Sequence, residues 1–331
     1  MFIKSYMVIF FIFLVIGTMI SVSANNWFTV WLGLEINLMS MIPIMINKLS
    51  QPLSEASIKY FITQALASVI LIISTVNNMF MNNMINLEMM NLLIIISLLM
   101  KSGMAPFHFW FPQVIMNMNW LQSLILFTWQ KIAPLILISS SLSYSLIWAS
   151  ALSAMVGAIS GLNQTILKLM LTFSSISHSG WMVMACSMNF KLWFLYFSVY
   201  SFLIISIINI VWNKYIKINE INFINNSTQF KMSWSSLILS LGGLPPMIGF
   251  LSKMMVINKI MFYSLFFVMS FLIFSSLISL YWYLRMIYSS LMIFSKNMKS
   301  IFYVNKSQMS LMLWVSTSMN ITSPTLLFIL T

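Results

Sequence analysis

The chain has 331 residues, of which 60% are hydrophobic and only 6% are charged. A soluble domain has roughly one-quarter charged residues, so the composition excludes an ordinary soluble enzyme and predicts a membrane protein. The formal net charge of +12 comes from 16 basic residues against four acids. Because the basic residues lie mainly between apolar segments, we interpret the charge as a topology signal and expect no nucleic-acid partner.

Apolar segments long enough to cross about 30 Å of hydrocarbon recur along the whole chain. They predict an all-α membrane protein with about 11 transmembrane helices and no separate soluble domain. The N-terminal segment is too long for the apolar core of a signal peptide, so we expect it to be the first span. The expected spans are 6–24, 27–46, 54–76, 88–109, 120–140, 143–161, 165–187, 191–212, 233–258, 261–288 and 309–330.

The lysines between these spans predict how the chain is oriented in its membrane. Those on the side of the N-terminus are Lys4, Lys48, Lys168, Lys214, Lys217, Lys231, Lys296, Lys299 and Lys306. The opposite side has Lys191 and Lys259. Because basic loops favour the cytosol-equivalent compartment, we expect the N-terminus there and the C-terminus on the other side.

Glycine and proline interrupt two of the expected spans. The fourth reads LLMKSGMAPFHFWFP and the ninth reads LGGLPPMIGFLSKMM. Proline removes a backbone donor, and unpaired backbone is tolerated within a membrane only where protein or a wet cavity surrounds it. Pro134 predicts a further break, in the fifth span. Broken spans at matching positions are typical of transporter repeats, so we expect five-helix repeats at 1–140 and 143–288, followed by a C-terminal helix at 309–330.

Ionisable side chains inside the expected spans are the first candidate functional residues. A charge at mid-membrane costs roughly 2.5–3.5 kcal/mol, and such residues usually mark an ion path or pair with a partner. They are Glu35, Lys101, Lys131 and Lys253. The alternatives are a Glu35–Lys101 ion pair that only fixes helix packing and a Lys253 side chain that reaches the membrane surface.

His108 and His178 are the two histidines of the chain. Histidine titrates near pH 6.5, roughly, so either side chain is able to take up and release protons. His178 follows three serines that can hold water between helices, although a buried structural histidine is the alternative for both. By contrast, Glu55 and Lys59 are four residues apart and predict an ion pair at a helix start.

Motifs for cofactors are missing from the sequence. There is no glycine-rich phosphate loop or dinucleotide fingerprint, and a single cysteine cannot form a disulfide framework or a Cys-based metal site. We therefore expect no NADH, flavin, ATP or iron–sulfur site on this chain.

Six stretches resemble a known family. They are WLGLEINLMSMIP, SEASIKYFITQALAS, LLMKSGMAPFHFWFPQV, TWQKIAPL, GLNQTILKLMLTFSSISHSGWM and LGGLPPMIGFLSKMMVI. In order, and across roughly residues 25–260, they resemble the family of NADH dehydrogenase subunit 2, the mitochondrially encoded, antiporter-like subunit of respiratory complex I. The start of the chain is similar to the animal form, which lacks three leading helices of bacterial relatives.

The resemblance implies two inverted five-helix repeats, similar to those of Mrp-type cation/proton antiporter subunits. The residues that match the family's proton-transfer positions are the helix carboxylate Glu35, its partner Lys101, the central lysine Lys131, His178, and the broken-helix lysine Lys253. His108 and Lys168 are further candidates, and relatives often carry two adjacent cations where this chain has Lys168 alone.

The same resemblance implies a proton-translocating role in the mitochondrial inner membrane, with the N-terminus in the matrix and the C-terminus in the intermembrane space. NADH, FMN, iron–sulfur clusters and ubiquinone would bind to other subunits and not to this chain. Its partners would be membrane-arm and accessory subunits and the lipid bilayer, with cardiolipin among the lipids. The alternatives are a structural assembly subunit, a stand-alone secondary transporter, and a haem protein that uses both histidines.

Overall fold

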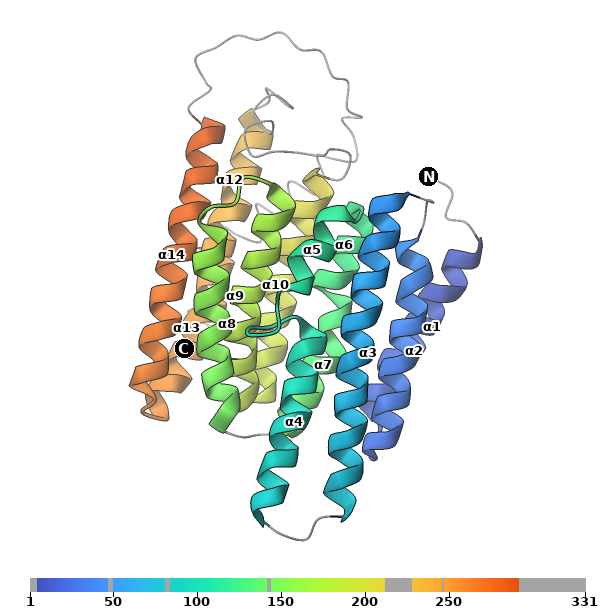
Figure 1. Ribbon diagram of the computed structural model, residues 1–331. Helices are drawn as coiled ribbons and strands as arrows, with labels where there is room; N and C mark the ends of the chain where they lie inside the picture. Colours follow the sequence, from blue (N-terminus) through green and yellow to red (C-terminus); the bar gives the residue numbers. More distant parts are fainter. Residues whose placement is uncertain are drawn as a thin grey trace. The chain divides into compact units, whose positions relative to one another are not determined.

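The structure is a computed structural model that describes residues 5–46, 50–80, 84–141, 144–211, 228–245 and 247–291. The described residues form helices joined by turns (Figure 1). They fall into two compact units, Met1–Ala149 and Ser150–Thr331, and the boundary lies within one helix.

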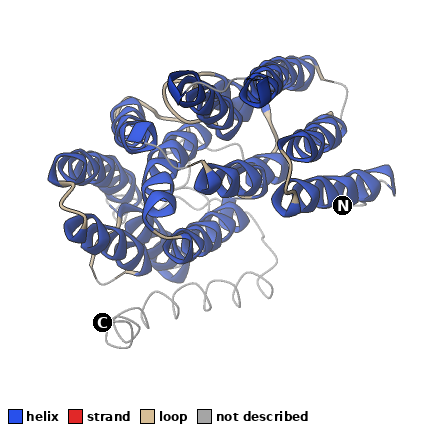
Figure 2. Cartoon of the chain, turned by 90° about the horizontal axis from the view of Figure 1, so that it is seen from below, coloured by secondary structure: helices blue, strands red, loops and turns tan. Residues whose placement is uncertain are grey.

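The first unit begins with four long helices. They are α1 (Ser5–Ser23), α2 (Trp27–Met45), α3 (Gln51–Phe80) and α4 (Met84–Ser102). Successive members of this series pack against each other. Three shorter helices follow, α5 (Trp110–Asn117), α6 (Trp120–Phe127) and α7 (Trp129–Ser140). Helix α5 contacts α3, while α7 contacts α4 and α1, so α5 and α7 pack on the long helices. Figure 2 shows the described elements from below as helices joined by loops.

The second unit is built around α9 (Leu167–Met188), which is buried over 170–186 without interruption. The helices α10 (Phe190–Val211), α13 (Ile248–Phe262) and α14 (Phe266–Leu291) all contact it. Helix α12 (Thr228–Gly242) packs on α10 and α14, and Gly157 of α8 (Tyr144–Gly161) lies against the α9 backbone.

Helix α3 shows a burial pattern that is inverted relative to a soluble protein. Large apolar side chains face outward, at Ile58, Ile62, Leu66, Val69 and Ile73. Gln64 and Ser68, on the same helix, are buried. Apolar side chains facing outward while polar ones face the protein fit a helix that borders lipid.

Six helical stretches are long and apolar enough to cross a membrane among the residues that the structure describes. They are Trp27–Met45, Gln51–Asn78, Trp120–Ser140, Tyr144–Gly161, Phe190–Val211 and Phe266–Tyr288. The predicted class, an all-α multi-pass membrane protein, is confirmed. The expected helix at 309–330 lies outside the described residues.

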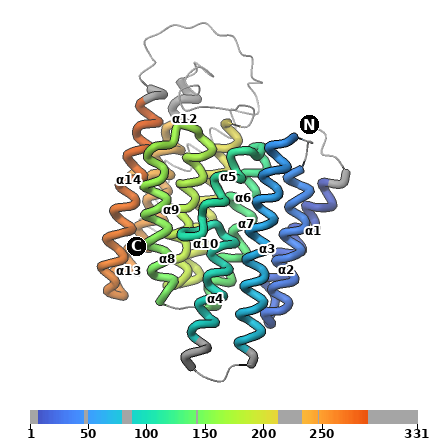
Figure 3. Tube along the Cα trace, viewed as in Figure 1, coloured from blue at the N-terminus to red at the C-terminus, as the bar shows by residue number. Residues whose placement is uncertain are grey.

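Both breaks predicted from glycine and proline are present (Figure 3). Helix α4 ends at Ser102 rather than at 109, and residues 103–109 form turns. The other break separates α12 from α13. Gly103 and Gly243 each follow a helix end with φ of 70° and 77°, a conformation that glycine adopts without steric cost. Helix α13 also runs to Phe262, so the tenth span begins later than expected.

The fifth span is broken, as Pro134 predicted, although the interruption does not lie at the proline itself. Pro134 lies inside α7, and the interruption is at Thr128, between α6 and α7. The proline ring crowds the carbonyl of Gln130 one turn earlier, so the strain falls on the start of the helix. There the Lys131 N–H donates to the Thr128 carbonyl at 3.3 Å, in a tighter turn than an α-helix has.

Helices α1 and α2 approach so closely that glycine is required at their contact. A Cβ atom at Gly33 would lie 2.6 Å from the Ser21 nitrogen and 2.8 Å from the Gly17 oxygen. Small residues permit such approaches between membrane helices. We expect Gly33→Ala to lower stability by about 1–3 kcal/mol, because neither backbone can yield.

The matched control for this prediction is Gly242→Ala, since a Cβ there would meet nothing nearer than the Tyr283 ring at 3.5 Å. Thermal unfolding of the assembled protein in detergent measures both variants. Equal unfolding midpoints for the two would show that the α1–α2 contact tolerates a methyl group.

Candidate functional site

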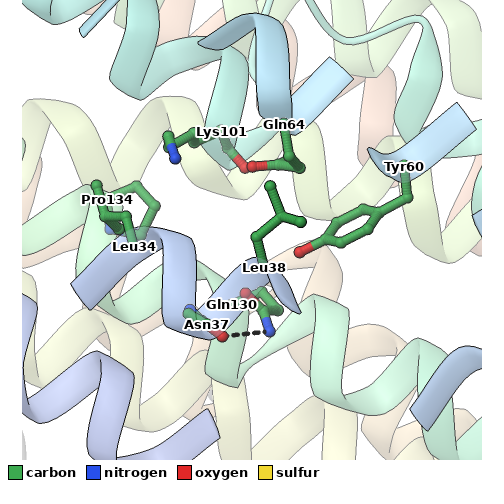
Figure 4. A pocket seen from close by; sticks show the side chains of 8 residues that line it. All are labelled: Leu34, Asn37, Leu38, Tyr60, Gln64, Lys101, Gln130 and Pro134. Atoms are coloured by element: carbon green, nitrogen blue, oxygen red, sulfur yellow. Dashed lines mark hydrogen bonds between the residues drawn. The ribbon is translucent and has the colours of Figure 1, made fainter. Parts of the chain in front are cut away.

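A small polar cavity lies among α2, α3, α4 and α7 of the first unit (Figure 4). Its volume is about 10 Å³, close to the space that one water molecule needs. The lining residues are Leu34, Asn37, Leu38, Tyr60, Gln64, Lys101, Gln130 and Pro134. Amide, hydroxyl and amino groups on several walls make the cavity suited to water.

The break after α4 explains part of this polar lining. A helix end leaves its last carbonyls without intrahelical partners, which is costly in a membrane. Gln64 of α3 donates from Nε2 to the Lys101 carbonyl at 3.3 Å, and Trp110 donates from Nε1 to the Met100 carbonyl at 3.2 Å. Side chains from α3 and α5 therefore satisfy the broken helix.

Glu35 and Lys101 interact without forming a direct ion pair. Lys101 is 6% exposed, so a charge on the Glu35 carboxylate would act on it with little screening by water. Neither takes part in an ion pair within 4 Å; the pair found among the described residues is Lys59–Glu55, at 2.6 Å on the surface, as predicted. The Oε2 atom of Glu35 is buried and accepts no hydrogen bond from a described group. A buried carboxylate oxygen in this state needs a compensating partner, such as an ordered water molecule.

Lys131 lies three residues beyond the break at Thr128 and is only 2% exposed. Its Nζ atom lies 5.5 Å from the centre of the Phe111 ring of α5, within the range of a cation–π interaction. His108, in the turn after α4, is 8% exposed, and its Nδ1 atom is buried with no well-formed hydrogen bond to a described residue. The first unit thus contains four of the predicted residues, with Lys101 alone among them lining the cavity.

The second unit places His178 among tyrosines. Its Nδ1 atom and the Tyr196 hydroxyl are hydrogen-bonded at 2.9 Å, and the Tyr200 ring lies 5.4 Å from the imidazole centre. Tyr196 and Tyr200 are four residues apart, so both face the same side of α10. The sequence interpretation missed both tyrosines; this i, i+4 spacing was the available signal. The preceding serines, such as Ser177, are buried and donate to carbonyls of their own helix.

Lys253 is held at the second broken helix. It is 6% exposed, and its Nζ atom donates to the Gly242 carbonyl at 2.9 Å. Because the carboxyl end of a helix carries partial negative charge, the end of α12 stabilises the ammonium group. The Lys253 Nζ atom also lies 6.0 Å from the Trp181 ring. A buried lysine that binds a helix end does not favour the alternative in which Lys253 reaches the membrane surface.

Lys168 is the second residue of α9 and is 4% exposed. It belongs to the second unit together with His178 and Lys253. The described residues contain no group of three His, Cys, Asp or Glu side chains arranged to hold a metal ion.

Comparison with known proteins identifies the family. Residues 24–279 match the family described as "NADH:quinone oxidoreductase/Mrp antiporter, TM". NADH-ubiquinone oxidoreductase chain 2 of Anopheles gambiae is 45% identical over 300 residues, which cover 87% of each chain. The chain belongs to the NADH-ubiquinone oxidoreductase chain 2 family. The resemblance predicted from six sequence stretches is therefore confirmed.

A more distant member of the family, NADH-ubiquinone oxidoreductase chain 2 of Myxine glutinosa, is 40% identical over 287 residues, covering 82% of this chain and 81% of the relative. Among solved structures, a chain of respiratory complex I from Thermus thermophilus with bound Aureothin has a TM-score of 0.86 at 20% identity, covering 97% and 78% of the two chains. A chain of the Mrp complex from Dietzia has a TM-score of 0.73 at 13% identity, covering 85% and 59%. The fold is thus shared with a chain of the Mrp complex.

Proposed function

We propose that this chain is a proton-translocating membrane subunit of respiratory complex I. The observation that carries the proposal is the placement of three buried lysines at helix breaks. Lys101 precedes the break after α4, Lys131 follows the break at Thr128, and Lys253 binds the end of α12. Buried charges are expensive, and broken membrane helices are tolerated where they line wet cavities. A buried lysine lies at each of the three helix breaks, and this favours a role in proton transport over a role in helix packing alone.

In the proposed mechanism, other subunits transfer electrons from NADH to ubiquinone, and the released energy reaches this chain as a shift in charge or conformation. The proton affinity of a buried lysine depends on the charges around it. Because Glu35 acts on Lys101 without contacting it, a small movement of α2 changes their interaction. Lys131, His178 and Lys253 would then take up and release protons in turn, with His108 and Lys168 as further participants.

The family also supports proposals about location and partners. The chain would cross the mitochondrial inner membrane and contact other membrane-arm and accessory subunits, with cardiolipin among its lipids. NADH, FMN, iron–sulfur clusters and ubiquinone would bind elsewhere in the complex. The N-terminus would face the matrix and the C-terminus the intermembrane space. Most lysines behind this orientation lie outside the described residues, so it stays a prediction, as do the repeats at 1–140 and 143–288.

Glu35→Gln separates proton translocation from a purely structural role. The variant keeps the size of the side chain but removes its charge, so we expect assembled complex at normal abundance and at least about a tenfold fall in protons pumped per NADH. Proton uptake and NADH oxidation by reconstituted complex give this ratio. Glu55→Gln is the matched control, because Glu55 is 57% exposed in a surface ion pair. Reduced abundance with normal pumping in the surviving complexes would support the structural alternative instead.

A further inference from the structure

Two amide side chains connect α2 to the broken helix α6–α7, one on each side of its break, and the first is more deeply buried than the second. The first is Gln122 of α6, which is fully buried. Its Nε2 atom donates to the carbonyls of Ile44 and Met45, both at 2.8 Å, and its Oε1 atom accepts the Asn119 N–H at 3.0 Å. Gln122 therefore satisfies carbonyls at the end of α2 while it also caps the start of α6.

The second connection lies beyond the break. Gln130 of α7 donates from Nε2 to Oδ1 of Asn37, on α2, at 2.9 Å. Asn37 is only 4% exposed, and both side chains line the polar cavity that Lys101 also lines (Figure 4). A hydrogen bond between amides in such a site is strongly directional, because a misplaced partner leaves a buried donor or acceptor unsatisfied.

The positions of these amides relate them to the candidate proton groups. Asn37 is two residues after Glu35, and Gln130 directly precedes Lys131. The Asn37–Gln130 hydrogen bond therefore connects α2 to the first turn of α7. The Gln122 hydrogen bonds connect α2 to α6, on the other side of Thr128. The bridge between Asn37 and Gln130 links the helix of the carboxylate to the helix of the lysine without itself holding a charge.

We propose that Asn37 and Gln130 are positioning residues that set the placement of Lys131 relative to Glu35 and to the cavity. This inference rests on the proposed function, since it assigns the pair a role in the same proton route. The pair acts through geometry: neither amide exchanges a proton with the route, and both hold the lysine helix in register with α2. A different arrangement of the same two groups should therefore serve equally well.

Gln130→Met in the assembled complex tests the proposal, because methionine keeps the length of the side chain and removes its hydrogen bond. We expect protons pumped per NADH to fall on the order of tenfold, because small misplacements of reacting groups slow their reactions by such factors. The reciprocal variant, Asn37→Gln with Gln130→Asn, keeps one amide pair of the same combined length and should return pumping to within about twofold of normal. Gln113→Met is the control, because Gln113 is exposed on α5.

Normal pumping in Gln130→Met would overturn the positioning role. Pumping measured in Lys131→Met then shows whether the proposed function is contradicted too. If Lys131→Met does not pump but Gln130→Met pumps normally, only the positioning role is contradicted. If both variants pump normally, the proposed proton route is contradicted as well. If Gln130→Met does not assemble, the reciprocal variant decides: assembly and pumping restored together support the proposal, and assembly restored without pumping contradicts it.

Discussion

Lys131→Met is expected to reduce proton-coupled NADH oxidation on the order of 100-fold, the range that a single positioned proton-transfer group contributes. Lys131 is 2% exposed at the start of α7, next to the amide bridge to α2. Methionine has a similar length and flexibility but no titratable group, so the variant removes the proposed proton site with little change in packing. The rates of NADH oxidation with a quinone as electron acceptor and of proton uptake are measured on the reconstituted complex. Their ratio to the rates of the unchanged protein gives the size of the loss.

Lys191→Met is the control for this experiment, since Lys191 is exposed at the start of α10. It should leave pumping unchanged, because an exposed lysine contributes little that lipid or water cannot replace. Normal pumping per NADH in Lys131→Met would remove Lys131 from the route. Loss of assembled complex without loss of specific pumping would assign it to folding.

Lys253→Met is expected to reduce pumping by at least about tenfold. Two effects combine in this variant: the proposed proton site disappears, and the Gly242 carbonyl at the end of α12 loses its donor at 2.9 Å. An unsatisfied buried carbonyl costs about 1–3 kcal/mol, so some loss of stability is expected as well. Thermal unfolding of the complex, measured beside pumping, separates the two effects.

The matched control is Lys259→Met, on the same helix but exposed. It should change neither pumping nor the unfolding midpoint. A Lys253→Met complex that is less stable but pumps normally would show that the lysine only caps the broken helix.

Much of the fold follows from hydropathy and from glycine and proline, because lipid imposes simple requirements on a chain. Long apolar segments predicted most helices, and Gly103 and Gly243 marked the ends of α4 and α12. Helix α5 was missed, because none of the expected spans covers residues 110–119. Its Pro112 lies in the first turn, where proline is tolerated. The interruption at Thr128 depends on how the helix accommodates the crowding between the Pro134 ring and the Gln130 carbonyl. Local sequence does not determine where that interruption falls.

The candidate site was only partly predictable. Charged residues in apolar segments are conspicuous, so Lys101, Lys131 and Lys253 could be identified as candidates without a structure. Their partners could not be, because Tyr196 reaches His178 only through the packing of α9 and α10. The bridge between Asn37 and Gln130 joins residues 93 positions apart, in a chain where asparagine and glutamine carry no special signal.

The most direct measurement is an experimental structure of the assembled complex that shows ordered water. Proton transfer through these groups predicts water within hydrogen-bond distance of Lys101 and Lys131 in the first unit, and of His178 and Lys253 in the second. Side chains at all four positions enclosed by apolar groups, with no ordered water beside them, would contradict it.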